Sequence, residues 1–396
     1  MESKPILSRL GILPLVPRDP AEPHRGATPL ELLFDLVSVI AIASAAVGLH
    51  HAISAAHITE GLLKFSASFF AIWWAWMNFT WYASAYDNND SLHRVLTIVA
   101  MAGSLIMAAG IDRFFQTNNI DMIVTGFVVM RTAMVCFWLR AAMHDPERRL
   151  TTYRYAIGIA IVQIYWVGLM FSQPIADNLL VIFYAVGALL ELVVPAYAES
   201  NYTTPWHRHH LIERYGLLNI IVLGETLLAG SLAIQRAASI NIDKELVGVA
   251  ISSLVLMFAL WWVYFSKEEQ IAQKRLSLAL FWGYGHLLIY MSGAAVGVGV
   301  AVLIDSISGH SSLPEAVGLY TIAVAISRYL FGLWVVRDRF ALAGAGRYIL
   351  LLTSVVLLFS PLVLPIEGIA ALLIMGVSIR NQYACKSVKQ VTLHGV

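Results

Sequence analysis

Long apolar stretches alternate with short polar segments over nearly the whole chain. Each apolar stretch has about twenty residues, which is the length that a helix needs to cross about 30 Å of hydrocarbon. The pattern therefore predicts an all-α, polytopic membrane protein with no sizeable soluble domain. Twelve transmembrane spans are predicted, at 30–50, 61–83, 95–111, 120–142, 153–172, 178–198, 216–236, 246–266, 277–303, 314–336, 346–364 and 366–384.

Motifs from the first half of the chain return in the second half. The run FAIWW at 70–74 returns as FALWW at 258–262, and the pair RY at 154–155 returns at 347–348. Such internal similarity is typical of proteins built from repeats. A unit with an even number of spans must repeat in the same orientation. The halves are therefore predicted to be two parallel six-helix repeats, related by an axis along the membrane normal.

The predicted repeats divide the chain into five parts. A cytoplasmic N-terminal segment covers residues 1–28, and the first six-helix repeat covers residues 29–200. An inter-repeat cytoplasmic loop at 201–214 leads to the second six-helix repeat at 215–385, and a cytoplasmic tail follows at 386–396. Because the number of spans is even, both termini are expected on the same side of the membrane.

Lysine and arginine residues are distributed unequally between the predicted loops. If the N-terminus lies in the cytoplasm, most of the 26 basic residues fall in inner segments. The outer loops and their edges then hold Lys64, Arg113, Arg236 and Lys244. Because loops that stay in the cytoplasm hold the positive charge, both termini are predicted to be cytoplasmic.

Composition supports a membrane protein and excludes several other classes. Hydrophobic residues make up 59% of the chain and charged residues 13%, whereas about a quarter of a soluble protein is charged. The net charge of +1 gives no reason to expect a nucleic-acid partner. The two cysteines, Cys136 and Cys385, form neither a CxxC pair nor a disulfide framework. Charged residues follow the apolar patch at 10–16, so no removable signal peptide is expected.

Ionisable side chains at membrane depth are the main candidates for function, because each is costly in hydrocarbon unless it is paired or hydrated. Six such residues lie within the predicted spans, namely Asp35, Arg131, Glu191, Glu225, His286 and Arg328. The repeat pattern predicts that Asp35 pairs with Arg131 and that Glu225 pairs with Arg328. Such pairs either clamp helices together or line an ion or proton path.

Several of these residues allow two interpretations. His286 either relays protons near neutral pH or is a hydrogen-bonded packing residue. Glu191 either belongs to the ion path or reaches interfacial water toward the inner face. The aromatic residues at 73–76 and 261–264 either pack between helices or form the wall of a pore or of an apolar ligand site.

Metal ions, cofactors and enzymatic chemistry are not expected. The run HRHH at 207–210 includes one arginine and lies beside Arg214, and their charge opposes cation binding. The run DNND at 87–90 lacks the spacing and the closing glutamate of a calcium loop, so a solvated helix end is predicted there. The chain has no Gly-rich phosphate loop, nucleophile elbow or HExxH sequence.

Three segments of the sequence resemble the bacterial low-temperature-requirement A (LtrA) family of membrane proteins. They are PLELLFDLVSVIAI at 29–42, an aromatic pattern at 73–87, and HLIERYGLLNIIVLGET at 210–226. The resemblance covers most of the chain and implies a multi-pass protein of the bacterial cytoplasmic (inner) membrane. The family takes its name from a growth phenotype in the cold, and its members generally lack an assigned biochemical activity.

Functions from different classes are compatible with these features. The first is a channel or secondary transporter for a small ion or solute, with a path at the interface of the repeats near mid-membrane. The alternative is a non-transporting membrane scaffold or sensor that responds to lipid state or cold, in which partners would seal the buried charges. An enzyme acting on lipid is a third alternative, which lacks a convincing nucleophile cluster. The expected partners are membrane lipids and a small ion or solute, and homo-oligomer formation is left open.

Overall fold

A computed structural model describes residues 11, 13–23, 25–238, 244–266 and 276–393. These residues form helices, turns and short loops, and no strand occurs among them. The predicted all-α class is therefore confirmed.

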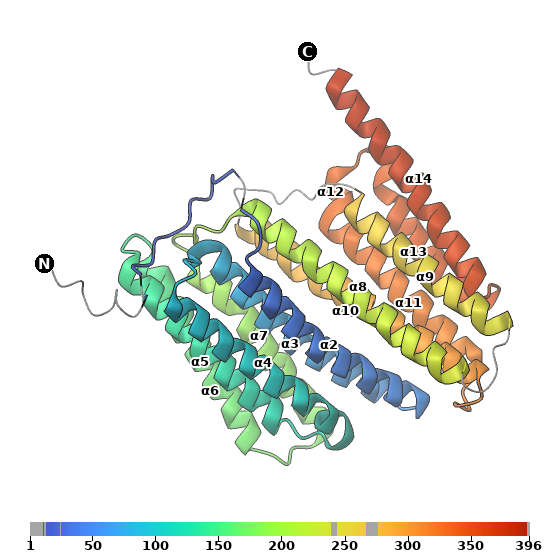
Figure 1. Cartoon of the computed structure of the whole chain (residues 1–396), viewed down its shortest axis with the longest axis horizontal. Helices are drawn as coiled ribbons and strands as arrows, with labels where there is room; N and C mark the ends of the chain where they lie inside the picture. Colours follow the sequence, from blue (N-terminus) through green and yellow to red (C-terminus); the bar gives the residue numbers. More distant parts are fainter. Residues whose placement is uncertain (1–10, 12, 24, 239–243, 267–275, 394–396) are drawn as a thin grey trace, which may run out of the picture. The chain divides into compact units, whose positions relative to one another are not determined.

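Six long helices follow one another in the first half of the chain (Figure 1). They are α2 (Pro29–Ser54), α3 (Ile58–Tyr86), α4 (Ser91–Thr117), α5 (Asp121–His144), α6 (Arg149–Phe171) and α7 (Asp177–Ala198). Local signals set the ends of α4. The Asp90 side chain accepts a hydrogen bond from the backbone amide of His93 at the start, and Asn118 adopts a left-handed conformation at the end.

The second half of the chain is also helical but less regular. Its helices are α8 (Arg208–Ala238), α9 (Lys244–Phe265), α10 (Leu276–Ile307), α11 (Glu315–Leu333), α12 (Arg339–Ala341), α13 (Ile349–Phe359) and α14 (Ile366–Leu393). A π-helical turn, η1 (Trp334–Asp338), joins α11 to α12. Two 3-10 turns, η2 (Gly344–Tyr348) and η3 (Ser360–Leu362), flank α13.

Every predicted span overlaps a helix, but the helices differ in how apolar they are. In the part of the chain that the structure describes, nine helical segments are long and apolar enough to cross a membrane. The helices α3, α8 and α14 are not among these nine. In α3, tryptophans, tyrosines and Asn78 lower the mean hydropathy of an otherwise apolar sequence. The count of twelve spans therefore stays a prediction.

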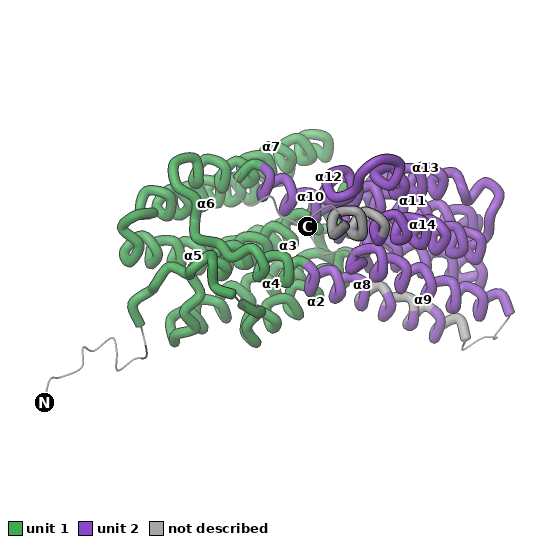
Figure 2. Tube along the Cα trace, turned by 90° about the horizontal axis from the view of Figure 1, so that it is seen from above, with its two compact units in different colours: residues 1–45, 63–215, 273–277 green, residues 46–62, 216–272, 278–396 purple. Residues whose placement is uncertain are grey.

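The chain divides into two compact units (Figure 2). Unit 1 comprises residues Met1–Ala45, Leu63–Tyr215 and Gln273–Ser277. Unit 2 comprises residues Ala46–Leu62, Gly216–Ala272 and Leu278–Val396. Unit 1 thus includes the first two turns of α8, which the sequence assigned to the inter-repeat loop. The repeat symmetry of the two halves stays a prediction.

The backbones of α4 and α5 approach each other closely within unit 1. A Cβ atom on Gly103 would lie 2.5 Å from the carbonyl oxygen of Gly126, and a Cβ atom on Gly126 would in turn overlap the backbone of Gly103 and Met107. Only a residue without a side chain fits at either position. Small residues that permit such close packing are typical of helix contacts in membranes.

The aromatic residues of the repeated motif have different surroundings in the two units. In α3, Trp73, Trp74 and Trp76 are at most 2% exposed, which favours packing between helices of unit 1. In α9, the side chains of Trp261 and Trp262 are 46% and 52% exposed. The prediction of packing between helices is therefore wrong for this second pair, because α9 turns that face outward in unit 2.

Candidate functional site

Two acidic residues of α2 face two basic residues of α8 within unit 1. Glu31 and Asp35 lie one turn apart on α2, and His210 and Arg214 lie one turn apart on α8. The Nε2 atom of His210 lies 2.9 Å from Oε1 of Glu31, although the two atoms are not aligned as in a regular hydrogen bond. Nη2 of Arg214 donates a hydrogen bond of 2.7 Å to Oδ1 of Asp35. We call these four residues the charged ladder.

Helix α3 contributes polar groups to the contact between Asp35 and Arg214. Nε1 of Trp76 donates a hydrogen bond of 2.6 Å to Oδ1 of Asp35, and Nη2 of Arg214 lies 3.3 Å from the hydroxyl of Thr80. Trp76 and Thr80 are one turn apart on α3, so the helix presents both to the same place. The ladder is thus held by three helices, α2, α3 and α8.

The charged ladder is buried inside unit 1. The side chain of Glu31 is 1% exposed, and those of Asp35, His210 and Arg214 are fully buried. Asp35 lies six residues into α2, which places it about 9 Å from the start of the helix. Opposite charges in direct contact offset much of the cost of removing each of them from water.

Several polar atoms of the charged ladder are not used by the protein. Among the described residues, Oδ2 of Asp35, Nε and Nη1 of Arg214 and Nδ1 of His210 are buried and have no hydrogen-bond partner. A buried donor or acceptor without a partner costs about 1–3 kcal/mol. Buried water commonly satisfies such groups. The ladder therefore has hydrogen-bonding capacity for water or for an exchanging proton.

Polar contacts continue from the ladder toward the N-terminal segment. The hydroxyl of Ser84, one turn beyond Thr80 on α3, accepts a hydrogen bond of 2.9 Å from the backbone amide of His207. Nε2 of His207 lies 2.6 Å from the carbonyl oxygen of Glu22. The guanidinium of Arg25 donates to the carbonyl oxygens of Ala83 and Ser84. The polar side chains thus extend from the ladder to the end of unit 1 where α2 and α8 begin.

The second buried charge pair of unit 1 joins Arg131 of α5 to Glu191 of α7. Nη2 of Arg131 donates a hydrogen bond of 2.7 Å to Oε2 of Glu191. Oε2 also accepts 2.8 Å from Nε1 of Trp74, and Oε1 accepts 3.2 Å from Nε1 of Trp166. Both oxygens of Glu191 are therefore bonded, so this carboxylate is sealed, whereas Nε of Arg131 is buried without a hydrogen-bond partner among the described residues.

The predicted pair of Asp35 with Arg131 is therefore wrong. Asp35 bonds to Arg214, and Arg131 bonds to Glu191. The prediction assumed that the acid of each repeat pairs with an arginine of the same repeat. The first residues of α8 belong to unit 1, however, and they supply the partner of Asp35. The prediction that Glu191 reaches interfacial water is also wrong, because this side chain is 2% exposed.

The remaining predicted site residues lie in unit 2. His286 is buried on α10, its Nδ1 lies 2.8 Å from the carbonyl oxygen of Trp282, and its ring packs against that indole at 4.4 Å. These contacts favour the packing interpretation. Arg328 lies exposed on α11. The side chain of Glu225 on α8 lies outside the described residues, so its pairing with Arg328 stays a prediction.

The prediction of a solvated helix end at 87–90 is wrong for the two aspartates, because Asp87 and Asp90 are buried, whereas Asn89 is exposed. Asp90 bonds to the Arg140 guanidinium at 2.5 and 2.9 Å and to the backbone amides of Leu13 and His93. Burial by itself raises the pKa of Asp90, but these hydrogen bonds outweigh burial and lower the pKa to about 2. Among the described residues, no group of three or more metal-binding side chains occurs.

Sequence reasoning missed most of the charged ladder and a further cluster in unit 2. The carboxylate of Asp338 accepts hydrogen bonds from Arg337 at 2.9 Å and from Arg380 at 2.6 and 2.8 Å. The sequence did not single out these two arginines or Arg214 as partners of a buried acid. The signal that could have revealed the ladder is the one-turn spacing of Glu31 and Asp35 and of His210 and Arg214.

Comparison with known proteins identifies the group to which the sequence belongs. The family model described as bacterial low temperature requirement A protein (LtrA) matches residues 26–379, which is nearly the whole chain. The chain belongs to the LtrA family. The protein RA0937 of Rhizobium meliloti (strain 1021) is 26% identical over 315 residues, which cover 74% of this chain and 72% of the relative. Family membership and the membrane-like helices together indicate a membrane protein.

Two of the segments that carry the resemblance to the LtrA family also form the charged ladder. The segment 29–42 supplies Glu31 and Asp35, and the segment 210–226 supplies His210 and Arg214. In this LtrA family member, segments far apart in the sequence therefore meet at one buried site. The site includes two carboxylates and a histidine, which are residue types that can exchange protons.

Proposed function

We propose that this LtrA family member moves protons through the bacterial cytoplasmic membrane, either as a channel or as a secondary transporter that couples protons to a small solute. The charged ladder of unit 1 forms part of the proposed path. The observation that carries the proposal is a fully buried set of two acids, a histidine and an arginine with unused polar atoms. Ionisable groups in this situation often mark ion pathways.

The pair of Asp35 with Arg214 and the pair of Arg131 with Glu191 differ in how many of their carboxylate oxygens are bonded, which suits the first to a proton path and the second to joining helices. Glu191 accepts three hydrogen bonds that occupy both of its oxygens, so it is suited to joining helices. Asp35 keeps Oδ2 without a partner among the described residues, so it is suited to accepting a proton. His210 lies next to Glu31 and belongs to the residue type that titrates near neutral pH.

Contact distances favour the proton over larger ions. Arg214 and Asp35 are only 2.7 Å apart, and His210 and Glu31 are only 2.9 Å apart. A hydrated metal ion must break these contacts in order to pass. A proton can move between the imidazole of His210 and the carboxylate of Glu31 with a small side-chain displacement, because the two atoms are already within hydrogen-bonding distance. Arg214 keeps its protons and stabilises the carboxylate of Asp35.

Liposomes that contain the purified full chain and a trapped pH-sensitive dye test this function. Under an imposed pH gradient and membrane potential, we expect proton flux above that of empty liposomes. Asp35→Asn and His210→Gln should each lower the flux at least about tenfold, because each removes a proton-accepting group. Asp121→Asn is the control, since Asp121 is an exposed acid at the start of α5.

Each variant must elute as a monodisperse species before its flux is compared. Because Asp35→Asn leaves Arg214 without its acid, Glu31→Gln serves as a milder second variant if Asp35→Asn does not fold. Unchanged flux in folded His210→Gln and Glu31→Gln would contradict the proposed path. A folded wild-type protein without flux under any gradient would favour the alternative of a non-transporting sensor, which the sealed carboxylate of Glu191 supports.

A further inference from the structure

The segment before α2 crosses the end of unit 1 where α2, α4 and α8 begin and where α3 and α5 end. We call residues 13–23 and 25–28 the N-terminal cover. The backbone amide of Leu13 donates a hydrogen bond of 2.9 Å to Oδ2 of Asp90, at the start of α4. The backbone amide of Arg18 donates 2.9 Å to the carbonyl oxygen of Ala85, near the end of α3. The cover therefore joins the ends of helices that are separate in the sequence.

Two buried side chains anchor the N-terminal cover to unit 1. One is Leu15, which is apolar, and the other is Arg25. The Arg25 guanidinium donates to the carbonyl oxygens of Ala83 and Ser84 and lies 3.9 Å from Oδ2 of Asp87. The last carbonyl groups of a helix have no partner within the helix, and a cation at that end is favourable. Arg25 is therefore the main polar anchor of the cover.

The N-terminal cover also contacts the residue that precedes α8. Nε2 of His207 lies 2.6 Å from the carbonyl oxygen of Glu22, so this nitrogen donates its proton to the cover. Nδ1 of the same ring accepts a hydrogen bond of 3.3 Å from the backbone amide of His210, and His207 thereby caps the start of α8. Since His210 belongs to the charged ladder, contacts run without a break from the cover to the ladder.

The N-terminal cover lacks the hydrogen bonds that hold a helix together. Proline recurs at every third residue, at positions 14, 17, 20 and 23. Proline has no backbone donor, and this spacing favours an extended chain whose backbone bonds to water or to neighbouring groups. The helix ends, His207 and Arg25 are all groups that water can solvate. Detachment of the cover therefore exchanges hydrogen bonds with protein for hydrogen bonds with water, which costs little net free energy.

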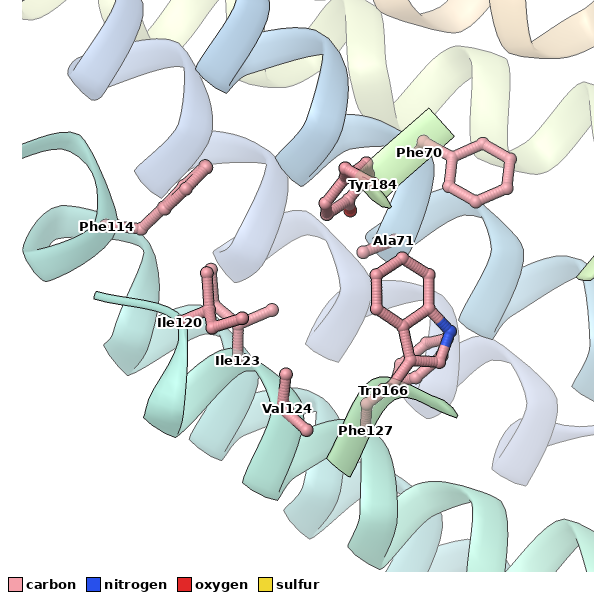
Figure 3. Close-up of a pocket in the computed structure, with 9 residues that line it drawn as sticks. All are labelled: Phe70, Ala71, Phe114, Ile120, Ile123, Val124, Phe127, Trp166 and Tyr184. Atoms are coloured by element: carbon pink, nitrogen blue, oxygen red, sulfur yellow. The ribbon is translucent and has the colours of Figure 1, made fainter. Parts of the chain in front are cut away.

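The charged ladder lies close to the end that the cover crosses. Glu31 and His210 are each the third residue of their helix. The apolar pocket of unit 1, shown in Figure 3, offers no comparable route for water, because its volume of about 20 Å³ has room for about one molecule. The polar groups of its lining are already bonded, since Trp166 donates to Glu191 and Tyr184 donates to a backbone carbonyl oxygen of α3.

We infer that the N-terminal cover is a gate, which detaches from unit 1 and rebinds, and that the charged ladder exchanges water and protons with the aqueous side only while the cover is detached. Arg25 holds the gate closed. When the cover leaves, the charge of Arg25 moves into water, and the ends of α3 and α8 become hydrated beside Glu31 and His210. The control of proton flux rests on the proposed function, whereas detachment of the cover does not.

Access of a thiol reagent to Ser84→Cys tests whether the cover detaches. Ser84 is buried, and its carbonyl oxygen is bonded to Arg25. The full chain, with Cys136 and Cys385 replaced by serine, is placed in nanodiscs and treated with a small cationic methanethiosulfonate, and modification is followed by mass spectrometry. We expect slow modification that becomes about tenfold faster when Arg25→Gln is added, because the rate follows the population of the detached form.

Matched variants separate this anchor from a general effect of removing charge. Arg18→Gln removes an arginine of the same segment, whose side chain bonds to Glu22 within the cover, and should leave the rate unchanged. Leu15→Ser removes the apolar anchor and replaces Arg25→Gln if that variant does not fold. Equal rates with and without the anchor variants, whether slow or fast, would overturn the inference.

A disulfide tests the effect of the closed cover on proton flux. A Cβ atom on Gly11 would lie 3.7 Å from Cβ of Ser91, and disulfide-bonded cysteines have a Cβ separation of about 3.8 Å. In liposomes of the same cysteine-free background, oxidised Gly11→Cys/Ser91→Cys should lose about nine-tenths of the flux and regain it on reduction. Gly11→Cys alone is the control, because it has the same backbone strain at φ +68° without the bond.

The two measurements fail in different ways. If the wild-type protein shows flux and the oxidised double variant keeps it, the cover does not control the ladder, and this part of the inference is overturned. If the wild-type protein shows no flux, the proposed function fails, and the modification rate of Ser84→Cys still decides whether the cover detaches.

Discussion

Buried charge in unit 1 is organised in two different ways at the scale of single residues. Glu191 is surrounded by donors from three helices, whereas Asp35 has two donors on one oxygen and none on the other among the described residues. Both acids lie in apolar spans, where an uncompensated charge is costly. This difference is the reason for proposing that Asp35, and not Glu191, takes up a proton.

The sequence predicted which residues are buried better than it predicted their partners. Asp35, Arg131 and Glu191 stand out because they interrupt apolar runs, and all three are buried. A helix sequence gives the direction of a side chain relative to its own helix but not which other helix lies opposite. Arg214 was missed as a partner because it lies near the start of α8, where an arginine resembles an ordinary loop charge.

A buried glutamate at the end of α7 should make the stability of the protein depend on pH. Oε1 of Glu199 accepts hydrogen bonds from Tyr155 at 2.8 Å and from Thr204 at 2.7 Å. Burial raises the pKa of Glu199 to about 7, although these hydrogen bonds partly oppose the increase. Its proton is therefore held more tightly in the folded protein than in the unfolded chain, where the pKa is 4.5.

The stabilisation from protonated Glu199 is complete below pH 4.5 and is lost as pH rises through about 7. The full change corresponds to about 3 kcal/mol of the free energy of unfolding. We expect the melting temperature of the detergent-solubilised protein to fall between pH 5 and pH 8. In Glu199→Gln this fall should be smaller, since the amide does not titrate. An equal fall in both proteins would show that other groups cause it.

At the scale of the helices, the apolar pattern predicted well where helices occur but did not predict irregular turns within them. The span predicted at 95–111 is part of a longer helix, α4, and the break predicted between the spans 346–364 and 366–384 separates α13 from α14. The π-helical turn at 334–338 was not predicted. A single π-helical turn within an apolar run leaves the periodicity of the sequence almost unaltered, so the hydrophobic pattern does not reveal it.

The contact of α4 with α5 gives a prediction at this scale. Gly126→Ala places a methyl group against the backbone of Gly103 and Met107, so the helices must separate. Overpacking of this kind typically costs about 1–3 kcal/mol. We expect a lower melting temperature, measured by thermal unfolding in detergent. Gly168→Ala on α6 is the control, because its Cβ atom would meet no atom within 4 Å. Equal melting temperatures of both variants would contradict the close packing.

At the scale of the whole molecule, the number of spans decides the topology. The predicted twelve spans with a cytoplasmic N-terminus place residue 117 outside and residue 200 inside. If only the nine most apolar segments crossed the membrane, α3 would not cross, and both positions would change sides. Residues 310 and 345 would lie outside and inside under either count. The first pair of positions therefore tests the count, and the second pair tests the orientation.

Single cysteines provide the measurement, in a background where Cys136 and Cys385 are replaced by serine. Thr117, Ser200, His310 and Ala345 are exposed, so their cysteine variants are accessible to reagent. With twelve spans, a membrane-impermeant maleimide added to intact cells should label Thr117→Cys and His310→Cys. Ser200→Cys and Ala345→Cys should react only after the membrane is opened. Labelling of Ser200→Cys instead of Thr117→Cys in intact cells would support nine spans. In that case α8, which carries His210 and Arg214, and α3, which carries Trp76, would not cross the bilayer. A transmembrane proton path along these helices would then be excluded.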